Sequence, residues 1–411
     1  MSAASWRVLI LLGFSIFINY VDRGNLSIAA PLIKNELKLS PSQLGILLSS
    51  FFWLYTLVQL PVGWLIDRFN VNWILAIGFF IWSAATGVTG ILHGFTALLI
   101  VRLLLGIAES VAFPSYGKIF AHNFHEHQRG VANGVIGVGQ SVGAAFASLA
   151  GGVIMSRFGW RPFFVVSGLI CLPWCLGWLR WAPPAKSPIR GELGYSSGAI
   201  IEVLQQRSLW GISLATFCAN YILFLLLTWL PYYLVQQRHF SLTLTGEISG
   251  AAFLIRAVTA FVSGRLSDRW ISAGKSPTLV LKSLVCVGSG LSGCLLVPCA
   301  MASDRVCVLL LFSAVACQGF ATPHFWNAAQ ALAGPRLAGT WTGLQVFISS
   351  FGSILGPLLT GFVVQATGGF VWAFALAAIA GLLGVLCWVF MVGPVRPVAW
   401  APVEESLALE A

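Results

Sequence analysis

Residues 63–69 read Gly-Trp-Leu-Ile-Asp-Arg-Phe, and residues 264–270 read Gly-Arg-Leu-Ser-Asp-Arg-Trp. The two stretches share glycine, aspartate, arginine and a final aromatic residue at the same spacing, 201 positions apart. Each follows an apolar run of the length that a helix needs to cross a hydrocarbon core of about 30 Å. The repeat therefore predicts two related halves, each built from membrane-spanning helices.

The composition is that of a chain whose solvent is mostly lipid. Of its 411 residues, 58% are hydrophobic and 9% are charged, whereas soluble domains average about 45 to 50% and about 25%. A soluble globular protein is thereby excluded. The net charge of +10 would suit a nucleic-acid partner in a soluble domain. Here the basic residues cluster at the edges of apolar runs, so we expect no nucleic-acid partner.

Twelve apolar windows are bounded by charged or turn residues, which predicts an all-α protein with twelve transmembrane helices. The windows are 7–33, 43–66, 72–92, 96–119, 130–156, 161–181, 208–235, 243–266, 277–299, 305–325, 337–365 and 369–392.

One long polar interval divides these windows six and six. We expect an N-terminal six-helix bundle over 1–181, a cytoplasmic linker over 182–207 and a C-terminal six-helix bundle over 208–392. Residues 393–411 are predicted to form a mobile cytoplasmic tail. With both termini in the cytoplasm, fourteen of the 23 Lys and Arg residues fall on the cytoplasmic side and six on the other. The positive-inside rule therefore favours this orientation.

Small-residue pairs mark two of the predicted spans as packing helices, because glycines four residues apart let helix backbones approach closely. They are Gly130/Gly134 and Gly139/Gly143 in the fifth span and Gly339/Gly343 and Gly352/Gly356 in the eleventh.

Five ionisable residues lie well inside predicted spans: Asp22, Arg23, Arg102, Glu109 and Arg256. Burying such groups in a membrane costs several kcal/mol by most scales, so they are functional candidates. Arg102 and Glu109 share one helix face, about 10 Å apart along the axis. These residues could neutralise one another as structural ion pairs. Their charges nevertheless sum to one unmatched positive charge, which an anionic substrate would balance.

The repeated loops suggest a gate. Glycine at a helix end allows a neighbouring helix to approach, and the Asp-Arg pair can bind charges or helix termini on that neighbour, forming a latch that breaks and re-forms. The alternative interpretation is a positively charged turn that obeys the positive-inside rule. The candidate gating residues are Gly63, Asp67, Arg68, Gly264, Asp268 and Arg269.

These loops resemble the signature loop of the major facilitator superfamily, and four further motifs resemble its anion:cation symporter family. That family includes bacterial hexuronate and galactonate carriers, sialin and the vesicular glutamate carriers. The motifs are Asn19-Tyr20-x-Asp22-Arg23, Phe51-Phe52-Trp53-x-Tyr55 with Gln59-x-Pro61-x-Gly63, Arg102-x-x-x-Gly106-x-x-Glu109-x-x-x-x-Pro114, and Gly339-Thr-Trp-x-Gly343-Leu-Gln345.

The resemblance implies two six-helix bundles around a central cavity and proton-coupled symport of a small organic anion, such as a sugar acid, by alternating access. It implies that Asp22 and Glu109 take up protons. It also implies that Arg23 and Arg102 bind the substrate. The remaining implied cavity residues are Tyr20, Tyr55, Gln140 and Gln345. We accordingly expect a multi-pass protein of a bacterial inner membrane, not an enzyme, that acts as a monomer without a cofactor.

The C-terminal half offers polar and aromatic groups suited to a hydroxylated ligand, although each could equally be a packing residue. His324 could titrate near neutral pH. Arg256 lies outside the pattern of the family that the chain resembles, and Val346 stands where relatives commonly have a polar residue. The candidates in this half are Asn220, Tyr221, Arg256, His324, Trp326 and Asn327.

Sequence features argue against two alternative functions and one metal site. A drug/proton antiporter shares the superfold, but three arginines inside the membrane make a poor cavity for cations. A membrane-embedded transferase would need a metal-binding carboxylate cluster, which the sequence lacks.

The run His122-Asn-Phe-His125-Glu126-His127 could bind Zn²⁺, yet we interpret it as a solvated loop and predict no metal site. We interpret the nine cysteines as small buried hydrophobic residues.

Overall fold

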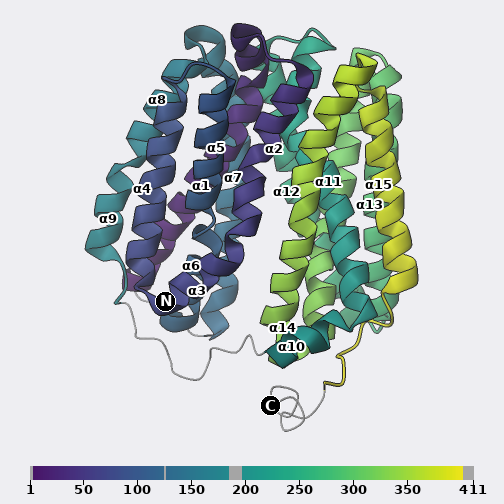
Figure 1. Ribbon diagram of the computed structural model, residues 1–411. Coiled ribbons are helices and arrows are strands. Elements are labelled where there is room, and N and C mark those ends of the chain that lie inside the picture. Colours follow the sequence, from purple (N-terminus) through teal and green to yellow (C-terminus); the bar gives the residue numbers. More distant parts are fainter. Residues whose placement is uncertain (1–2, 125, 185–196, 401–411) are drawn as a thin grey trace. The chain divides into compact units, whose positions relative to one another are not determined.

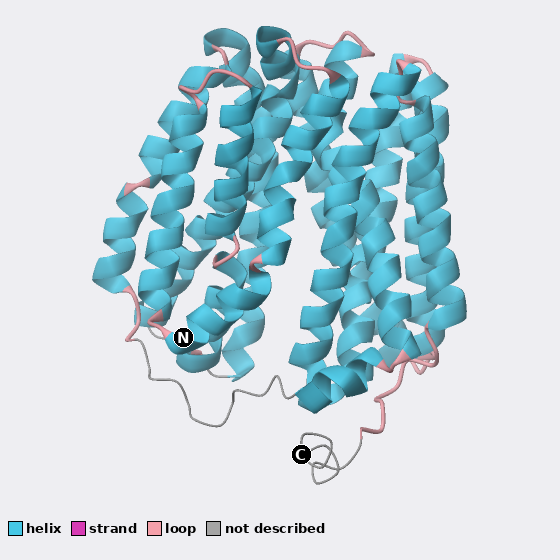
Figure 2. Cartoon of the chain, in the orientation of Figure 1, coloured by secondary structure: helices cyan, strands magenta, loops and turns pink. Residues whose placement is uncertain are grey.

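A computed structural model describes residues 3–124, 126–184 and 197–400. Its elements are all helices, as Figures 1 and 2 show for these described ranges. In chain order the helices are α1 (Ala3–Leu37), α2 (Pro41–Leu57), α3 (Gln59–Arg68), α4 (Val71–Thr89), α5 (Phe95–Glu109), α6 (Ala112–Asn123), α7 (Glu126–Phe158), α8 (Trp160–Cys171), α9 (Pro173–Trp181), α10 (Ser197–Leu204), α11 (Arg207–Gln236), α12 (Leu242–Ser272), α13 (Pro277–Met301), α14 (Asp304–Thr367) and α15 (Val371–Met391).

Prolines explain why several predicted spans appear as two helices. Proline has no N–H and its ring clashes with the carbonyl four residues earlier. In the second span α2 ends at Leu57, four residues before Pro61, and in the fourth span α5 ends at Glu109, five residues before Pro114. Among the described residues, eleven helical segments are long and apolar enough to cross a membrane. The predicted span 43–66, which is divided into α2 and α3, is missing from that count.

α14 joins two predicted spans. It runs through 64 residues but is interrupted at Gly334, whose φ of 63° lies in the left-handed region that favours glycine. Its two parts, Asp304–Gly334 and Gly339–Thr367, are the predicted tenth and eleventh spans. The predicted linker 182–207 contains α10.

The chain divides into two compact units that do not follow the sequence halves. Unit 1 comprises Met1–Pro188, Leu226–Leu254 and Pro357–Gly368, and unit 2 comprises the rest. Within unit 1, α1 lies along α7, α2 along α5, and α4 along α5 and α8. The C-terminal part of α11, the N-terminal part of α12 and the C-terminal part of α14 thus belong to the same unit as the N-terminal helices.

Glycines allow close helix contacts in unit 1. A Cβ atom at Gly143 of α7 would lie 2.4 Å from the carbonyl oxygen of Phe17 on α1. At Gly45 of α2 it would lie 2.9 Å from Cα of Gly361 on α14, and at Gly152 of α7 2.9 Å from Cα of Gly246 on α12. The latter two contacts join the N-terminal helices to segments from the second half of the sequence.

The packing role predicted for the fifth and eleventh spans is confirmed for four of the glycines and wrong for two. Gly139 and Gly143 pack on α1, and Gly352 and Gly356 pack on α11 through the backbone of Phe217 and Tyr221. Gly134 and Gly339 face open space within the described part of the chain.

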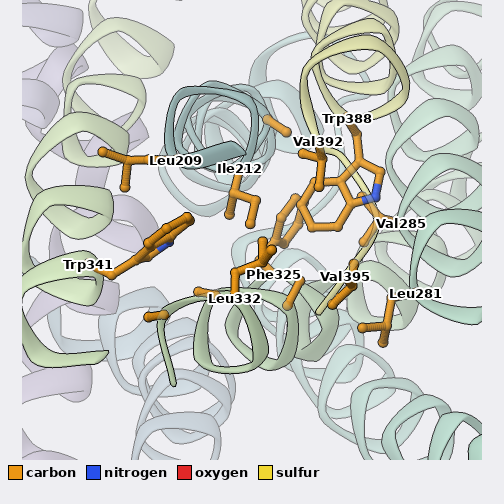
Figure 3. Close-up of a cluster of buried hydrophobic side chains, with 14 of the residues drawn as sticks. Leu209, Ile212, Leu281, Val285, Phe325, Leu332, Trp341, Trp388, Val392 and Val395 are labelled. Atoms are coloured by element: carbon orange, nitrogen blue, oxygen red, sulfur yellow. The ribbon is translucent and has the colours of Figure 1, made fainter. Parts of the chain in front are cut away.

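Unit 2 has a hydrophobic core where α11, α13, α14 and α15 meet. Figure 3 shows Phe325 of α14 beside Trp388 of α15, with ring centroids 5.3 Å apart at an interplanar angle of 87°. Val395, which follows α15, lies in the same core. Its N–H donates to Thr278 Oγ1 at 2.9 Å, and Trp400 Nε1 donates to the carbonyl of Ala333 at 2.8 Å. The prediction of a mobile tail is therefore wrong for residues 393–400, because apolar side chains anchor them, whereas 401–411 lie outside the described residues.

Candidate functional site

Four charged side chains are buried together inside unit 1. Asp22 and Arg23 lie near the middle of the 35-residue helix α1, and Arg102 and Glu109 lie on α5. Glu109 ends α5 because Pro114 interrupts the hydrogen-bond ladder directly after it. Asp22 and Arg102 lie within electrostatic reach of Glu109. The structure thus brings together the four N-terminal candidates that the sequence singles out.

The central contact is an ion pair between α1 and α5. Arg23 Nε donates to Glu109 Oε2 at 3.0 Å, with the side chains 6% and 0% exposed. Removing one partner of such a buried pair leaves an uncompensated charge and costs about 3–5 kcal/mol. The charge of each group is therefore stabilised by the presence of the other.

Aromatic rings surround the Arg23 guanidinium. Its Cζ lies 5.0 Å from the ring centroids of Tyr20 and Phe51 and 4.9 Å from that of Tyr55. The Arg102 guanidinium lies 5.1 Å from the same Phe51 ring. Each such contact stabilises a cation by about 0.5–2 kcal/mol. The rings thus add favourable contacts for two guanidinium groups, of which only that of Arg23 forms an ion pair within the described residues.

Hydrogen bonds connect this cluster to two other helices. Gln140 Nε2 of α7 donates to the Tyr20 hydroxyl at 3.0 Å. The hydroxyls of Ser15 on α1 and Tyr116 on α6 lie 2.6 Å apart. Sequence reasoning missed Ser15, Phe51 and Tyr116 as site residues, although Phe51 lies within a recognised motif. Tyr116 lies two residues after Pro114, so its position near the helix break could have marked it as a site residue.

Several charged atoms of the cluster lack partners among the described residues. They include Asp22 Oδ2, Arg102 Nε and Glu109 Oε1. In the same described part of the chain, Arg102 forms no ion pair within 4 Å. Buried polar groups are nearly always hydrogen-bonded in proteins, so unpaired ones mark a place where a ligand or a proton can bind. A carboxylate fits the Arg102 guanidinium, which offers planar, paired N–H donors.

The C-terminal candidates in unit 2 form a second polar group between α12 and α14. Arg256 donates through Nη2 to Thr322 Oγ1 at 3.3 Å. About two turns further along α12, Ser263 Oγ lies 2.7 Å from Nε2 of His324, whose side chain is fully buried. The Ser263 hydroxyl thus holds His324 between α12 and α14.

The other candidates of unit 2 differ in environment. Asn220 donates to the carbonyl of Ser349 at 3.1 Å, and Gln345 donates to Thr216 Oγ1 at 3.2 Å. Tyr221 is buried, Trp326 is half-buried and Asn327 is exposed. Asn220 and Gln345 therefore both tie α11 to α14.

Comparison with known proteins identifies the family. The sequence model of the Major Facilitator Superfamily matches residues 12–357. The chain belongs to the major facilitator superfamily. It is therefore a multi-pass membrane transport protein, and the expectation that it is not an enzyme agrees with its relatives, which are named as transporters.

Among the relatives of this superfamily member is a D-galactonate transporter of Escherichia coli, which is 30% identical and aligned over 96% of each chain. A hexuronate transporter of Bacillus subtilis is also 30% identical over 96% of each chain. The fold matches a crystal structure of a bacterial homologue of the human lysosomal transporter Spinster, with a TM-score of 0.83. That match covers 98% of this chain and 100% of the other at 19% identity, so it supports the fold alone.

The two superfamily signature loops do not show the close helix approach that was predicted at their glycines. A Cβ atom at Gly63 or Gly264 would meet no atom within 4 Å among the described residues, so the expected close helix approach is not seen there. Arg68, Asp268 and Arg269 are exposed. The side chain of Asp67 lies outside the described part of the chain. The latch stays a prediction.

No group of three metal-ligating side chains occurs in the described part of this superfamily member. His125 and the side chains of His122 and His127 lie outside that part, so the solvated-loop interpretation stays a prediction.

Proposed function

We propose that the chain is a proton-coupled symporter that carries a small hydroxylated carboxylate, such as a sugar acid, across a bacterial inner membrane. It acts as a monomer by alternating access, with both termini in the cytoplasm and the linker 182–207 on that side. The observation that carries the proposal is the buried group Asp22, Arg23, Arg102 and Glu109. The named substrates of the galactonate and hexuronate relatives supply the chemical class.

The geometry supports a cycle of proton and anion exchange. Without substrate, Glu109 neutralises Arg23 through their ion pair. Protons taken up by Glu109 and Asp22 would remove both negative charges and leave two guanidinium groups in a site that excludes water. A substrate carboxylate that binds Arg102 or Arg23 would then offset one of the two positive charges. A centre with a lower net charge can reorient at lower cost than one with two uncompensated charges.

Roles for the neighbouring polar groups follow from their contacts. Tyr20 is oriented by Gln140, and Tyr55 lies over Arg23. Their hydroxyls are candidates for donating to and accepting from sugar hydroxyls. In unit 2, we propose that Asn220, Tyr221, Arg256, His324, Trp326, Asn327 and Gln345 contribute to substrate selection.

The first measurement identifies the cargo. The melting temperature of the purified protein is recorded with D-galactonate, D-glucuronate, D-glucarate and succinate, and with D-galactose as an uncharged control. A ligand at 100 times its Kd stabilises the folded state by about 2.7 kcal/mol. We expect a rise with one class of anion and none with galactose. A rise with lipophilic cations alone would instead support a drug/proton antiporter.

The second measurement tests the coupling. In proteoliposomes with an imposed pH gradient, Glu109→Gln should abolish accumulation of that anion while retaining counterflow exchange, and Arg102→Ala should lose binding. Glu36→Gln is the matched control, because Glu36 also accepts from an arginine Nε, at 2.8 Å from Arg161, but is 45% exposed. Normal accumulation by both cluster variants would overturn the proposal.

A further inference from the structure

Two cysteines meet where α13 is followed by α14. The sulfur atoms of Cys299 and Cys307 are 3.2 Å apart, and the Cys299 thiol donates to the Cys307 carbonyl at 3.5 Å. Both side chains are fully buried. We propose that Cys299 and Cys307 are oxidised to a disulfide in the cell, which closes the α13–α14 turn covalently. The interpretation of the cysteines as small buried hydrophobic residues would then not describe this pair, and it is wrong for Cys294, which is exposed.

The backbone around the turn already holds the two sulfurs in place. α13 ends at Met301 and α14 begins at Asp304, so only two residues separate the helices. The N–H of Ala302 donates to the carbonyl of Pro298 at 3.0 Å, and that of Cys307 to the carbonyl of Ser303 at 2.8 Å. A disulfide bond is about 2.05 Å long, so the sulfurs must approach by about 1.1 Å.

The compartment follows from the proposed orientation, on which this inference rests. With the termini in the cytoplasm, the turn after the ninth span faces the other side of the membrane. In a bacterium that side is the periplasm, which is kept oxidising. Ser303, Asp304 and Arg305 are exposed, so the turn borders water. The terminal turns of helices open locally at low cost, which exposes the thiols to an oxidant.

The oxidant is a disulfide-bearing oxidoreductase or a small-molecule disulfide. One cysteine, as thiolate, attacks a sulfur of that disulfide, forming a mixed disulfide and releasing one thiol of the oxidant. The second cysteine, having also lost its proton, attacks the first cysteine's sulfur and releases the other thiol. The two electrons lost by the cysteines reduce the oxidant's disulfide, and the two protons pass to its thiols.

Differential alkylation of the full chain tests the proposal. Cells are quenched in acid, and the protein is denatured and labelled with light N-ethylmaleimide, reduced, and labelled with the deuterated reagent. Peptide mass spectrometry should find the deuterated label on Cys299 and Cys307 and the light label on Cys171 and Cys286. In Cys299→Ala, Cys307 should carry the light label. Light label on both cysteines of the unchanged chain overturns the proposal.

Two further measurements show which premise failed in that event. Purified protein is exposed to glutathione disulfide and mapped in the same way, and a green fluorescent reporter after residue 411 reports the side of the C-terminus. If the disulfide fails to form in the purified protein, the geometry is wrong. A reporter that does not fluoresce places the C-terminus outside and rejects the proposed orientation, whereas anion uptake tests the transport proposal independently.

Discussion

Replacing Gly106 by alanine tests how the packing of α2 on α5 positions the charged cluster. A Cβ atom at Gly106 would lie 2.2 Å from the carbonyl oxygen of Phe51 and 3.2 Å from the backbone N of Tyr55. Phe51 and Tyr55 are the rings that contact Arg23, and Phe51 also contacts Arg102. The new methyl group therefore meets backbone atoms, which cannot rotate away as a side chain could.

The size of the effect follows from these distances. Ordinary van der Waals contact begins at 3.4 Å, so the helices must separate by roughly 1.2 Å at this point. Overpacking of this kind costs about 1–3 kcal/mol. A displacement of about 1 Å at a positioned binding group can cost about 100-fold in rate. We therefore expect a lower melting temperature and an uptake rate reduced about 10- to 100-fold.

Gly117→Ala is the matched control. Gly117 lies on α6 in the same predicted span, and a Cβ there meets no atom within 4 Å among the described residues. Because alanine favours a helix over glycine by about 0.5–1 kcal/mol, this variant should be as stable as the unchanged protein or more so, with normal uptake. Initial uptake rates and melting temperatures are measured on both variants. Normal uptake and stability of Gly106→Ala would refute the claim that this contact positions the cluster.

Two further substitutions test contacts away from the cluster. Gly361→Ala places a Cβ 2.8 Å from Cα of Gly45, so we expect slower uptake and a lower melting temperature; equal uptake by this variant and by Gly339→Ala, whose Cβ meets open space, would contradict this. Arg161→Ala removes hydrogen bonds to Glu36 and to the carbonyls of Leu92 and Gly90, and should destabilise by about 1–3 kcal/mol. Glu36→Gln alone should cost less than about 1 kcal/mol, because exposed ion pairs contribute little; thermal denaturation in detergent that ranks these two variants in the opposite order would refute the comparison.

The sequence was sufficient to predict the membrane class and the four charged residues of the cluster. Charged groups inside apolar spans are rare because they are costly, so Asp22, Arg23, Arg102 and Glu109 stand out without any structure. It was not sufficient to predict how they pair. Arg102 and Glu109 share a face of one helix, yet Glu109 binds Arg23 of α1. That choice depends on how α1 packs against α5, which one helix's periodicity does not reveal.

Other features depended on contacts that local patterns do not encode. The breaks before Pro61 and Pro114 follow from proline chemistry and were available in the sequence. The packing of residues 393–400 could not be predicted from the sequence. A short stretch with apolar residues looks like a mobile tail unless the surface that it packs on is known. Cys299 and Cys307 likewise read as two of nine apolar cysteines. Only the two-residue turn between α13 and α14 brings their sulfurs together.

The two halves repeat their packing but not their charges. Gly106 packs on the backbone of Phe51 and Tyr55, and Gly352 packs on that of Phe217 and Tyr221, again a Phe and a Tyr four residues apart. In contrast, the buried Asp, Glu and Arg side chains among the described residues all lie in unit 1, whereas Arg256 of unit 2 is half-buried. Duplication of an ancestral six-span unit explains the shared glycine contacts. It does not explain four costly charges in one unit alone, since helices of unit 2 pack in the same way without them. Stability is therefore a poor reason for the cluster, and a role in binding and moving charge is the better one.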